Sequence, residues 1–371
     1  FIRPHMADEN DKRTIYMVDM HEPLMFLHNL DTTIKEPFAS NPAVLDAVEK
    51  NHKKLQIAMT KLYPGNLVLS LSSGIMYHRL VDCITALNDV PREPLVPRRL
   101  GKNMCVPFGK ILRGKVVPNT VTKTLHTDKV YEPDLNSFTI EPFPYYSPLK
   151  SQIETIKSFD RPVILVDDLV HTANRLQVLV PQLREDGIPI KKVVVGVLSG
   201  YGRDLMQCLK VPVESIYSMP NLRQWFVEST LYPFIGGDTV RREEMKVAGL
   251  QPSINMILPY ATPRLSGCSR EALVEFSACC IENSRDLFQV LEAEYRKMYA
   301  KNLTLSRLSE AVILPLCPDK GSCMEYDENL AASVYLENDL EMLQRMRKFM
   351  VTIRSEEHTS ELQSHLNLVC R

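Results

Sequence analysis

The sequence has no hydrophobic run long enough to cross a membrane, no excess of charge of one sign and no cysteine pattern typical of a metal site. A spanning helix needs about 20 apolar residues, whereas the longest apolar runs here have the length of strands. The formal net charge is -1 over 371 residues, and basic and aromatic residues do not interleave, so no nucleic-acid partner is expected. With 44% hydrophobic residues, the chain is expected to fold and to have no membrane partner.

Nine cysteines are present, and none has the spacing of a zinc site. Cys279 and Cys280 are adjacent in a helical pattern, where an intramolecular disulfide is geometrically unfavourable. Residues 1–5 do not begin a basic segment followed by an apolar one, so no signal peptide is expected. These features predict reduced thiols and a cytoplasmic protein.

The two ends of the chain are not expected to be natural ends. The sequence begins with Phe1 rather than methionine, and residues 354–364 resemble the in-frame translation of a sequencing adapter. We therefore expect residues 354–371 not to be native and leave them out of the fold prediction; the alternative is a genuine amphipathic tail. On the first interpretation the chain is a fragment, and further domains are missing from it.

The remaining sequence divides into three segments. Residues 1–40 are polar and predict an extension or linker, and Asn41 followed by Pro42 predicts the start of a helix. Residues 41–262 contain strand-length, mostly apolar segments at 67–71, 104–108, 162–166, 193–198 and 213–217, several of them followed by a loop and a helix. This pattern predicts an α/β domain, a mostly parallel sheet with helices on both faces and a site at the carboxyl ends of its strands. Residues 263–353 predict a helical C-terminal region.

The most informative segment is residues 163–175, in which four apolar residues lead into Asp167 and Asp168 and then into a short polar loop. Two carboxylates at the tip of a strand can accept hydrogen bonds from vicinal ribose hydroxyls, directly or through bound Mg²⁺. The loop and the helix that follows offer backbone N–H groups to a phosphate. The loop residues are His171, Thr172, Ala173, Asn174 and Arg175. The segment therefore predicts a site for a ribose 5-phosphate ligand.

This segment resembles the phosphoribosyl pyrophosphate (PRPP) motif of type I phosphoribosyltransferases, and the resemblance covers about residues 41–240. Ser72, Ser73 and Gly74 look like the pyrophosphate loop of that family. The basic segment 113–129, with Lys123 and His126 as catalytic candidates, sits where the family has a flexible catalytic loop. Trp225 and Tyr232 fall where it has a base-contacting hood. The motif is also similar to one in cytidylyltransferase-related multidomain proteins.

The phosphate loop departs from the family's pattern at two positions. Ala173 replaces the usual glycine, so we expect it to resist a positive φ and to crowd the phosphate. Arg175 replaces the last hydroxyl residue and could contact the phosphate directly. With these departures we still expect PRPP to bind, whereas the sequence does not predict whether PRPP is turned over.

Each candidate also has a plain structural interpretation. Asp167 and Asp168 could be solvated acids at a strand end, and residues 72–74 could be an ordinary turn between a strand and a helix. Residues 113–129 could be a solvated surface loop. The ring nitrogens of His171 could make their hydrogen bonds within its own loop, and Trp225 could pack in the core.

Two function classes follow, with a third as an alternative. The first is a phosphoribosyltransferase that binds PRPP with Mg²⁺ and transfers phosphoribose to a nitrogenous base with release of pyrophosphate. The second is a non-catalytic PRPP or nucleotide sensor that regulates a larger, cytidylyltransferase-related protein. The third is an assembly role for the helical region, without a ligand. The acceptor base is not predicted, and a homodimer is typical of such sheets.

Overall fold

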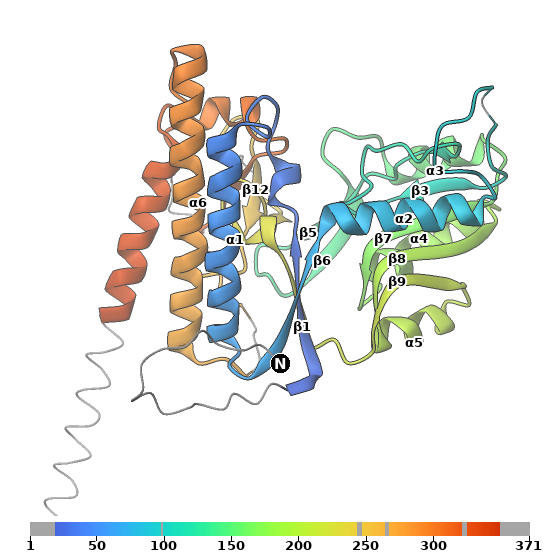
Figure 1. The fold of residues 1–371 in the computed structure, drawn as a ribbon, viewed down its shortest axis with the longest axis horizontal. Coiled ribbons are helices and arrows are strands. Elements are labelled where there is room, and N and C mark those ends of the chain that lie inside the picture. Colours follow the sequence, from blue (N-terminus) through green and yellow to red (C-terminus); the bar gives the residue numbers. More distant parts are fainter. Residues whose placement is uncertain (1–18, 98, 243–246, 264–266, 321–324, 349–371) are drawn as a thin grey trace, which may run out of the picture.

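The computed structural model describes residues 19–97, 99–242, 247–263, 267–320 and 325–348, and in this part of the chain three β-sheets and flanking helices make up the fold (Figure 1). The architecture is mixed α/β with mostly parallel sheets and a helical C-terminal region, as predicted. No helix of the described residues is long and apolar enough to span a membrane. The predicted adapter-derived segment, 354–371, lies outside the described residues.

The central sheet has five parallel strands in the order β4-β3-β7-β8-β9. Its members are β3 (Met104–Pro107), β4 (Val121–Thr122), β7 (Val163–Val170), β8 (Ile190–Ser199) and β9 (Val213–Met219). Successive side chains of β7 enter two different cores, with Val163 and Leu165 on one face and Ile164 and Val166 on the other. Because both faces are covered, the strand reads as an unbroken apolar run.

Helices cover both faces of this sheet. The face of Ile164 packs against Met76 and Leu80 of α2 (Ser73–Leu87). The opposite face packs against side chains of three helices, namely α3 (Leu149–Lys157), α4 (Asn174–Glu185) and α5 (Gly200–Cys208). These helices agree with the predicted alternation of strand, loop and helix.

A second, three-stranded parallel sheet lies between the central sheet and a layer of long helices (Figure 1). It consists of β1 (Asp19–His28) in the middle, β2 (Asn66–Ser72) and β10 (Gln224–Val227). Leu24 and Phe26 of β1 face the helical layer, whereas Met25 and Leu27 face the core that contains α2. Residues 1–40, which were predicted to be an extension or linker, thus contain β1 and η1 (Leu30–Thr33). The strands that pair with residues 24–27 of β1 are distant in the sequence, so no local pattern reveals them.

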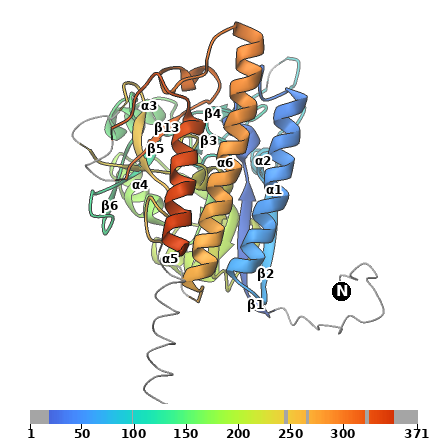
Figure 2. The same cartoon turned by 90° about the vertical axis from the view of Figure 1, so that its left-hand side faces the viewer.

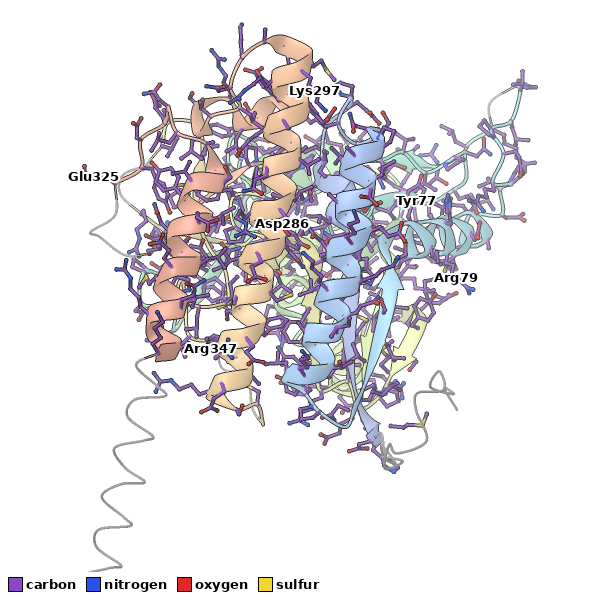
Figure 3. The ribbon with its side chains drawn as sticks, turned by 60° about the vertical axis from the view of Figure 1, so that its left-hand side comes forward. Tyr77, Arg79, Asp286, Lys297, Glu325 and Arg347 are labelled. Carbon is purple, nitrogen blue, oxygen red and sulfur yellow. The ribbon has the colours of Figure 1, made fainter. Side chains whose placement is uncertain are left out.

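The helical layer consists of α1 (Pro42–Leu62), α6 (Arg270–Tyr299) and the helix at residues 332–348, which stand side by side in Figure 2. The side chain of Asn41 caps α1, as predicted, by accepting hydrogen bonds from Ala43 N and Val44 N. Figure 3 shows Asp286 on the side of α6 next to α1, where its Oδ2 lies 2.9 Å from Lys54 Nζ. The C-terminal helices therefore share a core with α1 and the three-stranded sheet.

A third, mixed sheet has the order β13-β12-β11-β5-β6. Its strands are β5 (Thr127–Tyr131), β6 (Phe138–Pro142), β11 (Asp238–Val240), β12 (Gln251–Ile254) and β13 (Leu316–Pro318). The predicted flexible loop at 113–129 is instead held in part by sheet pairing, because β4 pairs with β3 and β5 pairs with β6 and β11. Two short 3-10 helices complete the fold, η2 (Glu228–Leu231) and η3 (Leu305–Glu310).

Candidate functional site

The two predicted carboxylates lie within the last four residues of β7 rather than beyond its end. The strand continues to Val170 because Leu169 and Val170 still pair with β8. Asp167 and Asp168 are only 9% and 7% exposed. The alternative interpretation, solvated acids at a strand end, is therefore wrong, and both acids are held in a largely desolvated position.

Asp168 anchors the loop that follows β3. Its carboxylate accepts hydrogen bonds from Lys110 N at 2.6 Å and from Ile111 N at 3.0 Å. Gly109 makes this approach possible, because a Cβ atom there would lie 2.4 Å from Asp168 Oδ1. Burial raises the pKa of Asp168, and the N–H groups of Ile111 and Lys110 act against that rise. Both oxygens of Asp168 are thus committed to positioning a neighbouring loop.

Asp167 is the carboxylate that remains for a ligand. Its Oδ1 accepts a hydrogen bond from Asp168 N at 2.9 Å and lies 3.8 Å from Nη1 of Arg175. Arg175 also donates to the carbonyl oxygen of Phe108 at 3.4 Å. Burial raises the pKa of Asp167 to about 7, although the charge of Arg175 opposes the rise. This carboxyl group therefore changes its charge near neutral pH.

The loop after β7 turns sharply into α4. Ala173 takes φ 51° and ψ 22°, the left-handed conformation, and is the N-cap of α4. The expectation that Ala173 would resist a positive φ is wrong, so the loop keeps a turn that normally favours glycine. Asn174 Nδ2 donates to Thr172 Oγ1 at 2.8 Å, which braces the turn.

His171 at the start of this loop is held by the neighbouring strand. Its Nδ1 lies 2.9 Å from Oγ of Ser199, the last residue of β8. The same hydroxyl caps α5 by accepting a hydrogen bond from Gly202 N at 3.0 Å. Burial lowers the pKa of His171, which favours the neutral imidazole.

The carboxylates and the loop border a cavity of about 450 Å³. The predicted site residues that line it are Asp167, Asp168, His171, Thr172, Ala173, Asn174, Arg175 and Trp225. Trp225 lies in β10, so the three-stranded sheet also provides part of the wall of the cavity. The structure thus brings the whole predicted ribose-phosphate motif and one hood residue to one cavity.

Charged residues from other elements also line the cavity. Among the described residues these are Lys110, Lys129, Arg223 and Asp238. Lys129 Nζ lies over the rings of Tyr131 and Phe138, 4.3 Å and 4.2 Å from their centroids, which suits a partly desolvated cation. Together with Arg175, the cavity has four cationic side chains facing three carboxylates, and it can hold a highly anionic ligand.

Sequence reasoning missed Lys110, Arg223 and Asp238, and it named Lys129 only as a member of the basic segment. For Lys110 a signal existed. Lys110 follows the end of strand β3, and Asp168 lies near the end of β7. The carboxyl ends of neighbouring parallel strands meet at one edge of a sheet. Arg223 and Asp238 belong to segments whose place in the sheets cannot be predicted from the local sequence pattern.

Other predicted site residues do not line this cavity. Ser72, Ser73 and Gly74 join β2 to α2, and Ser72 pairs in register with His28 of β1. Lys123 is exposed, and His126 stacks on Tyr146 with ring centroids 3.7 Å apart. Tyr232 is buried in the core shared with the helical layer.

Comparisons with known proteins give a likeness to solved structures alone. The sequence matches no protein-family model and no curated protein. Among solved structures, a purine phosphoribosyltransferase from Pyrococcus horikoshii Ot3 matches with 13% sequence identity and a TM-score of 0.25, covering 42% of this chain and 87% of that chain. A score this low carries no inference about ligand or reaction, which must come from the residues of the cavity.

Proposed function

We propose that this chain binds PRPP together with Mg²⁺ at the end of β7 and transfers its phosphoribosyl group to a nitrogenous base. The single observation that supports this most is the convergence of Asp167 with the 171–175 loop on one cation-lined cavity. A ribose 5-phosphate needs an acceptor of hydroxyl hydrogen bonds beside a phosphate site, and these two elements supply both.

The 5-phosphate would be held by the loop and by the start of α4. Asn174 begins that helix, whose first N–H groups have no partner within it. Arg175 can leave its 3.8 Å contact with Asp167 and donate two parallel hydrogen bonds to phosphate oxygens. The diphosphate of PRPP would lie against the cationic side chains, Lys110, Lys129 and Arg223, which can stabilise the charge of the leaving group.

Magnesium fits the carboxylates of this cavity, since Mg²⁺ prefers oxygen ligands and keeps several waters. Asp168 already accepts two backbone hydrogen bonds, so Asp167 would make the contact, through water or through the ribose hydroxyls. The ion would supply neutralisation of the diphosphate charge. The protein's own contribution is to hold the ribose and the phosphate in place and to exclude water.

A non-catalytic PRPP or nucleotide sensor is the second candidate. It is favoured by the positions of Lys123 and His126, which do not line the cavity, and by the alanine at the turn of the phosphate loop. A sensor would retain the ribose-phosphate contacts without the groups that promote departure of pyrophosphate.

Calorimetric titration with PRPP and Mg²⁺ tests the binding step. Arg175→Gln should weaken binding at least about tenfold, because a charge-assisted hydrogen bond contributes about 1.5–3 kcal/mol. Arg184→Gln is the matched control, since Arg184 lies in the last turn of the same helix and donates to Lys210 O. Equal affinities for the two variants, or no binding by folded wild type, would overturn the proposed ligand site.

Release of pyrophosphate separates the two candidates. Incubation of the chain with PRPP, Mg²⁺ and a panel of purine and pyrimidine bases should give base-dependent pyrophosphate if the chain is a transferase. PRPP binding that Arg175→Gln abolishes, without release of pyrophosphate for any base, would instead support the sensor.

A further inference from the structure

Two histidines and a glutamate from three separate elements meet away from the cavity. His28 ends β1, His52 lies on α1 and Glu228 begins η2. Glu228 Oε2 lies 2.6 Å from His52 Nε2 and 3.6 Å from His28 Nδ1. One ligand atom from each residue fits within a 4.8 Å span, and the two imidazole centroids are 3.9 Å apart.

The cluster is buried, and its polar atoms are only partly used. Glu228 is fully buried, and its Oε1 has no hydrogen-bond partner among the described residues. Leu30 N reaches only Oε2, at 3.4 Å. Burying a carboxylate oxygen without a partner is unfavourable. Because the backbone of the described residues supplies only one weak hydrogen bond to this carboxylate, a bound cation would stabilise it.

The surroundings of His28 orient its ring as they would for a metal ligand. Its Nε2 contacts Ser70 Oγ, which can accept a hydrogen bond from the ring, and Gln56 Nε2 donates to the same hydroxyl at 3.0 Å. With Nε2 engaged, Nδ1 is the nitrogen that faces Glu228. Metal-binding histidines typically use their second ring nitrogen in this way, which sets both the ring orientation and the tautomer.

We propose that His28 Nδ1, His52 Nε2 and the Glu228 carboxylate bind a zinc ion. Two imidazoles and one carboxylate form a donor set that suits Zn²⁺, with the fourth tetrahedral position left to water. The hard oxygen-only sets that Mg²⁺ or Ca²⁺ prefer do not match it. The side chains of His28 and His52 are 13% and 22% exposed, so the cluster lies near the surface of the fold, with the nitrogens that face Glu228 turned inward.

A zinc ion here would join parts of the fold that are distant in sequence. It would link the end of β1 to α1 and to η2. Thr230 and Leu231 of η2 line the ligand cavity described above. The ion would therefore stabilise the wall of the cavity without contacting its ligand, which is a structural role independent of the proposed transferase chemistry.

Metal binding by the full chain tests the proposal. After treatment with chelator and dialysis, titration with Zn²⁺ against a chromophoric chelator should show one tight site per chain. His52→Gln should weaken that site at least about tenfold, and His78→Gln, an exposed histidine outside the cluster, should leave it unchanged. His52 is partly exposed, so this variant is informative even where Glu228→Gln fails to fold.

Two further measurements test whether the metal binds at this cluster rather than elsewhere on the chain. Bound Co²⁺ should give the visible bands of a tetrahedral site without thiolate charge-transfer absorption, which excludes binding by cysteines. Zn²⁺ should raise the melting temperature of wild type and not that of His52→Gln. A folded chain that binds no Zn²⁺, or that binds it equally well in His52→Gln, would overturn the proposal and leave the 2.6 Å contact between His52 and Glu228 as a contact within the protein alone.

Discussion

Ala173 shows how a single residue can carry strain at the candidate site. An L-residue in the left-handed conformation costs about 1–2 kcal/mol, and Ala173 is also nearly buried, at 7% exposure. The turn nevertheless forms, since the chain must pass directly from β7 into α4. The strain is offset by the packing of the sheet and helix on either side.

Ala173→Gly should stabilise the protein by a few tenths of a kcal/mol to about 1 kcal/mol. Glycine removes the strain of the positive φ, and its greater freedom in the unfolded chain cancels part of that gain. Ala300→Gly should behave likewise, because Ala300 has φ 52° at the end of α6. Ala43→Gly, in the first turn of α1, should destabilise instead. Chemical denaturation of the three variants checks the signs, and a loss of stability at position 173 would contradict the strain argument.

The charge of Asp167 makes stability depend on pH. Burial raises the pKa of this carboxyl from its ordinary value to about 7. Between those two values the native state holds a proton that the unfolded chain has lost, so stability falls as pH rises across this window, by at most about 1.4 kcal/mol per pH unit. Below the window the group contributes no pH dependence.

Asp167→Asn should remove this dependence. The amide oxygen still accepts the hydrogen bond from Asp168 N, while no charge has to be buried. The variant should therefore gain stability over wild type progressively from about pH 4 to about pH 7, measured by denaturant unfolding at several pH values. Asp204→Asn, on the exposed surface of α5, is the control. If the difference in stability between Asp167→Asn and wild type does not change with pH, the burial of a charged Asp167 is not its cause.

At the scale of elements, the carboxyl end of β7 is crowded by close backbone approaches. A Cβ at Gly109 would meet Asp168 Oδ1, and one at Gly196 of β8 would lie 2.6 Å from the carbonyl oxygen of Asp168. The loop after β3 and the strand β8 thus both pack closely against Asp168. This packing explains how Asp168 can be both desolvated and fully engaged in hydrogen bonds.

Gly109→Ala should therefore destabilise the protein by about 1–3 kcal/mol, the cost of forcing an extra methyl into a packed site. It should also weaken PRPP binding, because the loop carrying Lys110 must shift. Gly74→Ala is the matched control, since its Cβ would meet only Ser72 Oγ at the ordinary distance of 3.5 Å. Thermal unfolding of both variants checks the contrast, and equal melting temperatures would contradict it.

The elements also show which parts of the fold a single sequence can predict. Strands β3, β7 and β8 were found because apolar runs between turns mark strands buried on both faces, and β2 and β9 were found as shorter runs of the same kind. The third sheet was missed, since β5 pairs with β11 across about a hundred residues and each strand is short. The same long sequence separation explains why the site was predicted only in part. The motif at 163–175 was visible locally, and Lys110 could have been found from its place after β3, whereas Arg223 and Asp238 reach the cavity through pairing that no local pattern encodes.

At the scale of the whole molecule, α1 and α6 behave as one packed unit. Asn51 Nδ2 donates to Asn283 O at 2.8 Å, and Asn283 Nδ2 donates to Asn51 O at 3.0 Å. Both amides are almost completely buried, so the pair sets how the two helices align, because a shift would leave buried polar groups without partners. The core of this unit continues into Leu24 and Phe26 of β1.

The predicted division at residue 262 would therefore cut through a common core. A chain ending there loses α6, whose Phe276, Leu287, Phe288 and Leu291 are at most 1% exposed. Their burial contributes on the order of 10 kcal/mol, which is comparable to the whole stability of a typical domain. We expect residues 1–262 to be aggregated or unfolded by size-exclusion chromatography and circular dichroism, whereas residues 1–353, which keep α6 and the helix at 332–348, should give a cooperative unfolding transition. A folded, monomeric 1–262 would instead mean that the central sheet and its helices are stable without the helical layer.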